Sequence, residues 1–171
     1  MAIKTFLFGL DRAGKTYITN FLIVSMSMGA SGYKPTLGFN VKDLSMEDLQ
    51  FQIWDAPGQA KLRKTWKRGY TKAELLVFIL DVADRDRFQE ARETLKDVLD
   101  KVKTKKAPLI FCYHKMDLPE AQANLEKAKN YFFSTSWERE FPTVAVETSI
   151  HQPESMEKLK QQFVLKAQTL K

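Results

Sequence analysis

Residues 9–16 read Gly9-Leu10-Asp11-Arg12-Ala13-Gly14-Lys15-Thr16 and match the pattern G-x-x-x-x-G-K-[ST] in full. The residues before them, Lys4–Phe8, form a short apolar run typical of a strand, and Tyr17–Ser27 after them resemble a helix. A glycine-containing loop between a strand and a helix directs backbone N–H groups and the positive end of the helix dipole at one point. We therefore predict a phosphate-binding loop, with a chance Lys-Thr pair in an ordinary turn as the alternative.

In this loop each residue type has a definite task. The Lys15 ammonium would reach the β- and γ-phosphates of a nucleotide, and the Thr16 hydroxyl would hold Mg²⁺. The backbone around them would surround the phosphates. The predicted phosphate-contacting residues are Asp11, Arg12, Ala13, Gly14, Lys15, Thr16 and Tyr17.

The composition is that of one globular domain, residues 1–171, with 44% hydrophobic and 28% charged residues. No apolar run approaches the ~20 residues that span a bilayer. The sequence runs directly into its first strand, so we expect no cleaved signal peptide. Ala2 and the C-terminal Gln168–Lys171 offer no myristoylation glycine or prenylation cysteine. The single cysteine, Cys112, lies in an apolar run and is expected to be a buried strand residue of a cytoplasmic protein.

The chain is basic, with a net charge of +6 and a pI of about 9.3. Solvated helix faces account for such charges in most proteins, and attraction to anionic lipid or nucleic acid is the alternative. Because no aromatic-rich basic groove motif is evident, we expect no specific nucleic-acid binding. Any peripheral membrane contact is expected to be electrostatic and sensitive to salt.

Strand-like and helix-like patterns alternate along the chain. Leu75–Leu80 is continuously apolar, as in a strand covered on both faces, whereas residues 87–103 show helical spacing. This alternation predicts a mostly parallel six-stranded sheet with helices on both faces, and a hairpin turn at residues 45–48 gives it one antiparallel edge strand. The predicted strands are Ile3–Gly9, Phe39–Leu44, Leu49–Trp54, Leu75–Asp81, Leu109–Tyr113 and Thr143–Glu147, and further helices are expected over Glu120–Phe132 and from Pro153 to Leu170.

The segment Trp54-Asp55-Ala56-Pro57-Gly58-Gln59 ends the third predicted strand. Asp55 at the carboxyl end of a strand beside the phosphate loop would hold Mg²⁺. Gly58 would bring its N–H close to the γ-phosphate, and the Gln59 amide suits the orientation of an attacking water molecule. The alternatives are a turn residue that ends a strand and a solvated loop side chain. Gln59 and Lys15 are the predicted catalytic residues.

Thr36 lies in the aperiodic segment 28–38 after the phosphate-loop helix. Its hydroxyl would complete the Mg²⁺ shell and its N–H would meet the γ-phosphate, so the segment would respond to hydrolysis. The predicted metal ligands are thus Thr16, Thr36 and Asp55.

Tyr113-His114-Lys115-Met116-Asp117 closes the fifth predicted strand. A carboxylate such as Asp117 can accept two hydrogen bonds from guanine, whereas adenine would leave it unpaired at a high cost. The Lys115 stem would lie over the base. The turn containing Ser149 and Ile150 would offer backbone N–H groups to the base oxygen, and a plain turn is the alternative there.

Together these motifs resemble the Ras-superfamily small GTPases, specifically the ADP-ribosylation-factor type. The resemblance rests on the phosphate loop and on Pro35–Val41, Trp54–Gln59, Leu62–Arg63 with Trp66–Arg68, Asp84–Phe88 and Lys115–Pro119, in order along nearly the whole chain. It implies a P-loop G domain that binds GTP, GDP and Mg²⁺, hydrolyses GTP and serves membrane trafficking or related regulation. It also implies that residues 28–40 and 55–70 rearrange with the nucleotide. An exchange factor, a GTPase-activating protein and an effector would bind through residues 28–70.

Four residues depart from the family pattern. His114 replaces an asparagine, and its imidazole N–H would donate to guanine N7. Pro57 replaces a glycine and restricts its loop, and Arg12 replaces a small or uncharged residue, as a solvated side chain or an internal charge. Gly69 replaces a tyrosine of the aromatic effector surface. We also expect the chain to lack the family's N-terminal amphipathic helix. The departures leave open a second hypothesis, a non-catalytic GTP- or GDP-bound scaffold similar to the signal recognition particle receptor beta subunit, and a third, an adenine-nucleotide or nucleic-acid binder supported only by the basic pI.

Overall fold

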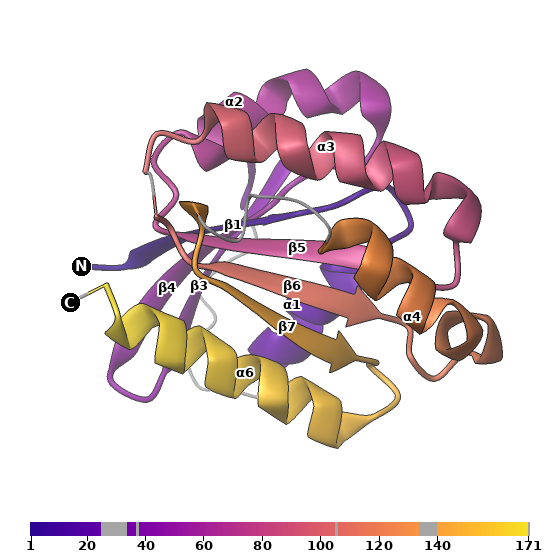
Figure 1. Ribbon diagram of the computed structural model, residues 1–171. Coiled ribbons are helices and arrows are strands. Elements are labelled where there is room, and N and C mark those ends of the chain that lie inside the picture. Colours follow the sequence, from indigo (N-terminus) through magenta and orange to yellow (C-terminus); the bar gives the residue numbers. More distant parts are fainter. Residues whose placement is uncertain (25–33, 37, 105, 134–139, 171) are drawn as a thin grey trace.

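The computed structural model describes residues 1–24, 34–36, 38–104, 106–133 and 140–170, and for residues 34–36 the backbone only. Its centre is a seven-stranded sheet in the order β2-β3-β4-β1-β5-β6-β7 (Figure 1). The strands are β1 (Ile3–Phe8), β2 (Lys34–Thr36), β3 (Phe39–Met46), β4 (Leu49–Asp55), β5 (Leu75–Asp81), β6 (Leu109–His114) and β7 (Thr143–Thr148).

The predicted fold class is confirmed. β1 pairs in parallel with β4 and β5, and the parallel pairing continues through β6 to β7. β3 runs antiparallel to β4, and Met46 pairs with Leu49 around a tight turn in which Glu47 has φ 52°. The prediction missed β2, which pairs antiparallel with β3 at the edge. A three-residue strand containing proline is too short to show a period of two, and Pro35 is tolerated there because the strand is an edge strand.

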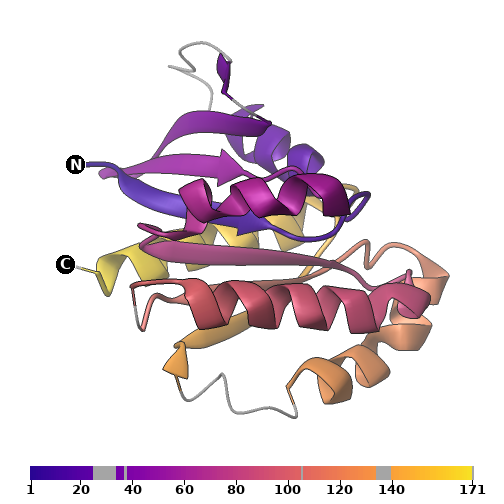
Figure 2. The same ribbon diagram turned by 90° about the horizontal axis from the view of Figure 1, so that it is seen from above.

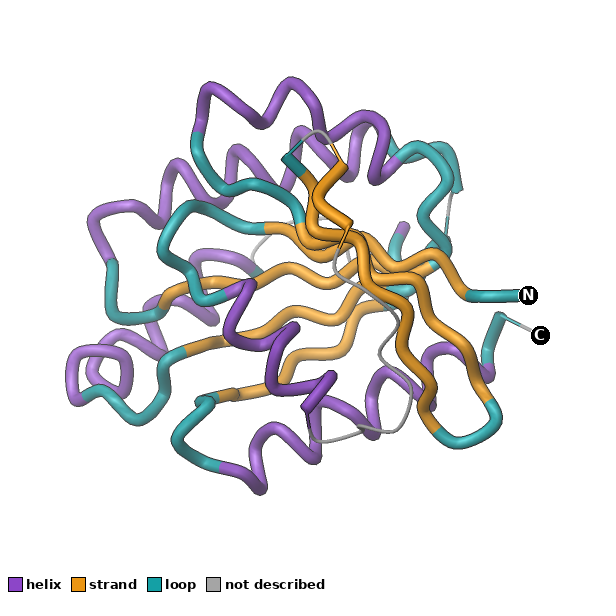
Figure 3. The backbone as a smooth tube through the Cα atoms, turned by 180° about the vertical axis from the view of Figure 1, so that it is seen from behind, coloured by secondary structure: helices purple, strands orange, loops and turns teal. Residues whose placement is uncertain are grey.

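The helices cover both faces of the sheet, as the sequence predicts. Figures 1 and 2 show α2 and α3 along one face and α1 and α6 along the other, and Figure 3 shows the strands as one layer between them. Prolines occupy the first turns of α4 and α6, where a missing N–H is not needed. The bounds are α1 (Lys15–Val24), the 3₁₀ segment η1 (Ala60–Trp66), α2 (Lys67–Tyr70), η2 (Arg85–Arg87), α3 (Phe88–Lys101), α4 (Pro119–Phe132) and α6 (Pro153–Gln168). The predicted continuation of the first helix to Ser27 lies outside the described residues.

Alternating residues of the strands pack into two separate hydrophobic cores, one on each face of the sheet. In β1, Phe6 and Phe8 pack with the helices α2, α3 and α4, whereas Leu7 packs with α1 and α6. Cys112 is fully buried in the second core, and burial raises the pKa of its thiol, as expected of a packing residue. No helix within the described ranges is both long and apolar enough to cross a membrane.

This topology brings the predicted binding and catalytic residues to one end of the sheet. The register pairs Leu7 with Asp55 across β1 and β4, and pairs His114 with both Asp81 and Thr148 across β5, β6 and β7. Parallel strands present their carboxyl ends at a common edge, where open α/β sheets bind ligands. In Figure 1 this edge lies opposite the two chain termini.

Candidate functional site

The phosphate-loop motif folds around its own lysine. Arg12 and Gly14 take left-handed backbone angles, φ 63° and 99°, and the turn closes with a hydrogen bond from the Ala13 N–H to the Leu10 oxygen (3.3 Å). Lys15 then starts α1, and its Nζ donates to the Leu10 oxygen at 2.6 Å. The loop therefore holds the ammonium group at its centre, at the amino end of a helix.

Lys15 carries its positive charge in a buried position, where desolvation disfavours the charged form. The side chain is 6% exposed, and burial lowers its pKa to about 8, although Asp55 and Asp11 oppose this shift. A buried ammonium gains stability from a neighbouring anion. This loop thus fits a polyphosphate, which would supply the negative charge that the protein side chains supply only in part.

Thr16 and Asp55 provide two hard oxygen donors beside Lys15. Thr16 Oγ1 donates to Asp55 Oδ2 at 3.0 Å, whereas Asp55 Oδ1 is buried and has no hydrogen-bond partner among the described residues. Asp55 is 3% exposed, and desolvation raises its pKa. An unpartnered buried carboxylate oxygen next to a hydroxyl group fits Mg²⁺, which prefers such ligands. Thr36 ends β2, but its side chain lies outside what the structure describes.

Gly58 is packed onto the phosphate loop. A Cβ at this position would lie 2.4 Å from both the Asp11 nitrogen and Lys15 Nζ, so only glycine fits. Its neighbour Pro57 is anchored, because Trp66 Nε1 donates to the Pro57 oxygen at 2.8 Å. Gln59 is exposed at the start of η1, where its backbone oxygen accepts from the Leu62 N–H.

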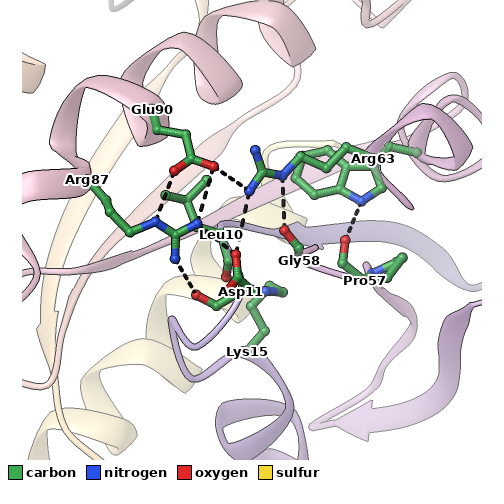
Figure 4. Close-up of polar contacts among 9 residues, drawn as sticks. Leu10, Asp11, Lys15, Pro57, Gly58, Arg63, Arg87 and Glu90 are labelled. Atoms are coloured by element: carbon green, nitrogen blue, oxygen red, sulfur yellow. Dashed lines mark hydrogen bonds and ion pairs between the residues drawn. The ribbon is translucent and has the colours of Figure 1, made fainter. Parts of the chain in front are cut away.

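A four-residue ionic network, which the sequence argument did not assign to the site, joins these parts (Figure 4). Arg87 binds Asp11 Oδ1 at 2.7 Å and Glu90 Oε2 at 2.9 Å. Arg63 binds Glu90 Oε1 at 2.8 Å and also donates through Nε to the Gly58 oxygen at 3.0 Å. The hydrogen bond from Arg87 lowers the pKa of both Asp11 and Glu90.

The network connects the phosphate loop, η1, η2 and α3. Arg63 and Arg87 entered the sequence argument only within motifs of the family resemblance, and Glu90 did not enter it. The signal that the sequence offered is the spacing of Arg87 and Glu90, three residues apart as in a helical ion pair. The Arg12 side chain is exposed, which agrees with a solvated role rather than an internal charge, and Tyr17 is 68% exposed.

Lys115 joins the phosphate loop to the predicted base-binding side. The residue has φ 66°, and its Nζ donates to the Arg12 oxygen at 2.7 Å and to Asp81 Oδ2 at 2.6 Å. Its ammonium therefore ties β5 and β6 to the loop. The contact leaves the predicted role of the Lys115 stem over a base as a hypothesis.

Asp117 is held by Ser149 rather than left free in a turn. Ser149 Oγ donates to Asp117 Oδ1 at 2.6 Å, and this bond lowers the pKa of the carboxyl. The Ser149 N–H donates to Ser155 Oγ at 2.9 Å, so it does not serve as the free donor that we predicted for a base oxygen. Ile150 follows in the same turn and is half-buried.

His114 faces the protein on both sides of its ring. Nδ1 hydrogen-bonds with Thr148 Oγ1 at 2.8 Å, and the Cδ2–Nε2 edge lies against Gly14, where a Cβ would come within 2.7 Å. Burial lowers the pKa of this imidazole to about 4. The imidazole thus links β6, β7 and the phosphate loop, and its donation to a base nitrogen stays a prediction.

Comparisons with known proteins agree with this arrangement. The sequence matches the family model described as the ADP-ribosylation factor family over residues 1–163. The fold is similar to that of the Arl6 BBS3 small GTPase from Trypanosoma brucei, solved with the bound nucleotide analogue GppNp. The TM-score is 0.78 at 20% identity, and the match covers 99% of this chain and 98% of that one. The fold is thus that of a small GTPase.

Proposed function

Because the chain belongs to the ADP-ribosylation factor family, we propose that it is a GTP/GDP molecular switch that hydrolyses GTP with the help of Mg²⁺. The observation that carries this proposal is the buried Lys15 beside the Thr16–Asp55 pair, where one carboxylate oxygen has no hydrogen-bond partner among the described residues. A cationic centre next to hard oxygen donors suits a phosphate chain and its metal. Asp117, held by Ser149, supports a preference for guanine.

Each residue then has one task in hydrolysis. Bound Mg²⁺ would supply charge neutralisation on the phosphates, with Thr16, Asp55 and Thr36 as its protein ligands. Lys15 would neutralise charge that develops on the β- and γ-phosphates, and Gln59 would orient the attacking water. Since an arginine finger is commonly worth ~10³–10⁵ in rate, we expect slow turnover without an activating protein.

Nucleotide retention tests the binding part of the proposal. Purified protein should retain GTP or GDP, and added Mg²⁺ should slow release of the nucleotide. GTP, but not ATP, should compete for the site. A folded protein that retains neither nucleotide at micromolar concentration with Mg²⁺ present would contradict the proposal, and equal competition by ATP would contradict the role of Asp117.

Single-turnover hydrolysis tests the catalytic part. Gln59→Leu should slow hydrolysis strongly and leave GTP binding intact, whereas Gln161→Leu, an exposed glutamine on α6, should change neither. Unchanged hydrolysis in Gln59→Leu would remove Gln59 from the mechanism.

A non-catalytic, nucleotide-loaded scaffold is the second candidate. It is favoured by the anchored Pro57 carbonyl and by His114, which both restrain the site, whereas the exposed Gln59 favours catalysis. Retained nucleotide with no single-turnover hydrolysis, with or without candidate activators, would select the scaffold.

The proposal extends to location and partners. Regulators and an effector would bind through residues 28–70, in a cytoplasmic setting with salt-sensitive membrane contact, in trafficking or related regulation. Vesicle association that persists at high salt would contradict the electrostatic contact.

A further inference from the structure

A basic groove of about 720 Å³ lies beside η1 and α2, next to the beginning of β1. Five of the nine residues that line it are cationic: Lys4, Lys64, Lys67, Arg68 and Lys72. None of the described residues that line it is acidic, whereas the neighbouring groove between α2 and α3, which shares Lys64 and Lys67 with it, includes two glutamates and an aspartate. The uniform charge is therefore a property of this groove and not of the whole α2 surface.

The cations of the groove are not neutralised by the protein. Within the described part of the chain, none of the five forms a salt bridge. Lys4 Nζ donates to the Arg68 oxygen at 2.9 Å and lies 4.2 Å from the centre of the Trp54 ring. The nearby Glu74 carboxylate accepts from the Lys4 backbone N–H, and within the described residues it forms no salt bridge with the Lys4 ammonium. The surface keeps a concentrated positive charge that suits an anionic partner.

Between the cations the groove is apolar. Leu62, Thr65 and Thr71 line it together with the aliphatic stems of the lysines. A recessed apolar floor can take one or two aliphatic side chains, which a charged rim alone would not require. The cationic rim and the apolar floor of the groove thus suit a ligand that carries both carboxylates and an apolar side chain.

We propose that this groove docks an acidic segment of a partner protein, with an aliphatic side chain on the floor and carboxylates on the lysine rim. A bilayer would contact mainly the rim of a recessed groove and would leave the floor empty. A nucleic acid would lack stacking partners among the described lining residues, none of which is aromatic. The proposal rests on the proposed function only in treating the face beside Gly58–Trp66 as a partner-binding face.

Selection of random twelve-residue peptides on the full chain, carrying whatever nucleotide it retains, tests this proposal at physiological ionic strength. The selected peptides should be rich in Asp and Glu around Leu, Ile or Val. Their affinity should fall roughly tenfold or more for Lys67→Glu/Arg68→Glu, because like charges would then face each other. Lys127→Glu/Lys158→Glu, which has the same net charge and alters exposed lysines elsewhere, should bind as the wild type does.

A separate variant tests the contribution of the apolar floor to peptide binding. Leu62→Ser should weaken the selected peptides while leaving the rim charge unchanged. Peptides without acidic residues, or peptides that bind the groove variants as tightly as the wild type, would overturn the proposal. Loss of binding to phosphatidylserine-containing vesicles in Lys67→Glu/Arg68→Glu, with no acidic peptides selected, would assign the groove to membranes instead. Nucleotide content, measured on each sample, reports on the proposed function separately.

Discussion

His114 provides a quantitative test of how the nucleotide end of the sheet is built. Its imidazole is 2% exposed, bonds to Thr148 and packs against Gly14. Burial, with help from the Lys115 charge, lowers its pKa from 6.5 to about 4, and Asp81 and Asp117 oppose this shift only in part. The folded protein therefore requires a neutral imidazole at this position.

The sign of the pH effect follows from linkage. Because the pKa of His114 is lower in the folded state, the unfolded chain binds more protons between pH 6.5 and 4, and stability falls as the pH falls through this window. The full difference, from 6.5 to about 4, corresponds to roughly 3 kcal/mol at about 1.4 kcal/mol per pKa unit. At about pH 5 the expected loss relative to neutral pH is about 2 kcal/mol.

The substitution His114→Asn removes this titration and keeps a polar side chain near Thr148. Urea unfolding of wild type and variant at about pH 7 and pH 5 gives the free energy of unfolding of each. The loss on acidification should be about 2 kcal/mol smaller in the variant, whereas His151→Asn, which changes the other, exposed histidine, should show the wild-type loss. An equal acid loss in His114→Asn and wild type would refute the buried, neutral imidazole.

Three further predictions concern other contacts in the same half of the molecule. In the nucleotide-free protein Lys15 has a pKa of about 8, so about nine-tenths of its amino groups are neutral at pH 9. Because a neutral amino group must take up a proton to pair with phosphates, the affinity for GDP should fall above pH 8. Calorimetry in two buffers should detect this proton uptake. Gly58→Ala would place a methyl group 2.4 Å from the Asp11 nitrogen, so GTP hydrolysis should slow and urea unfolding should show a loss of roughly 1–3 kcal/mol; wild-type values for both would contradict the packing. Gly69→Ala would approach Phe6 Cδ2 to 2.5 Å and should destabilise the core by roughly 1–3 kcal/mol in the same assay, with nucleotide retained; a neutral effect would mean that the ring can move aside.

The sequence predicted the layers of the fold because their signals are local. Continuous apolar strands, helical spacing and first-turn prolines all depend on neighbouring residues. β2 and the helical segment 60–70 were missed because both depend on contacts with residues distant in the sequence. β2 is defined only by pairing with β3, and residues 60–70 mix cations with Trp66 and Tyr70, which are buried against Phe6 by tertiary packing.

The sequence predicted that the candidate site residues lie at one edge of the sheet, but it did not predict their contacts. Motif spacing predicts which side chains reach the carboxyl edge of the sheet. It does not predict which acceptor each hydrogen-bond donor binds. The N–H of Ser149 is taken by Ser155, and Lys115 is tied to Arg12 and Asp81. The Gly69 departure also gains a physical reading, since Phe6 and Phe39 fill the space in which a larger side chain would stand.

The contacts of Arg63 link Gly58, beside the phosphate loop, to the basic groove. Gly58 lies against Lys15 Nζ and the Asp11 nitrogen. Under the proposed function a terminal phosphate would bind at these two donors and would displace Gly58. Arg63 donates to the Gly58 oxygen and pairs with Glu90 on α3, a helix that packs in the core through Ala91 and Leu95. Moving Gly58 therefore strains or breaks the Arg63 contacts. Because Arg63 lies between Leu62 and Lys64 of the basic groove, we expect the shape of that groove to depend on what occupies the phosphate loop.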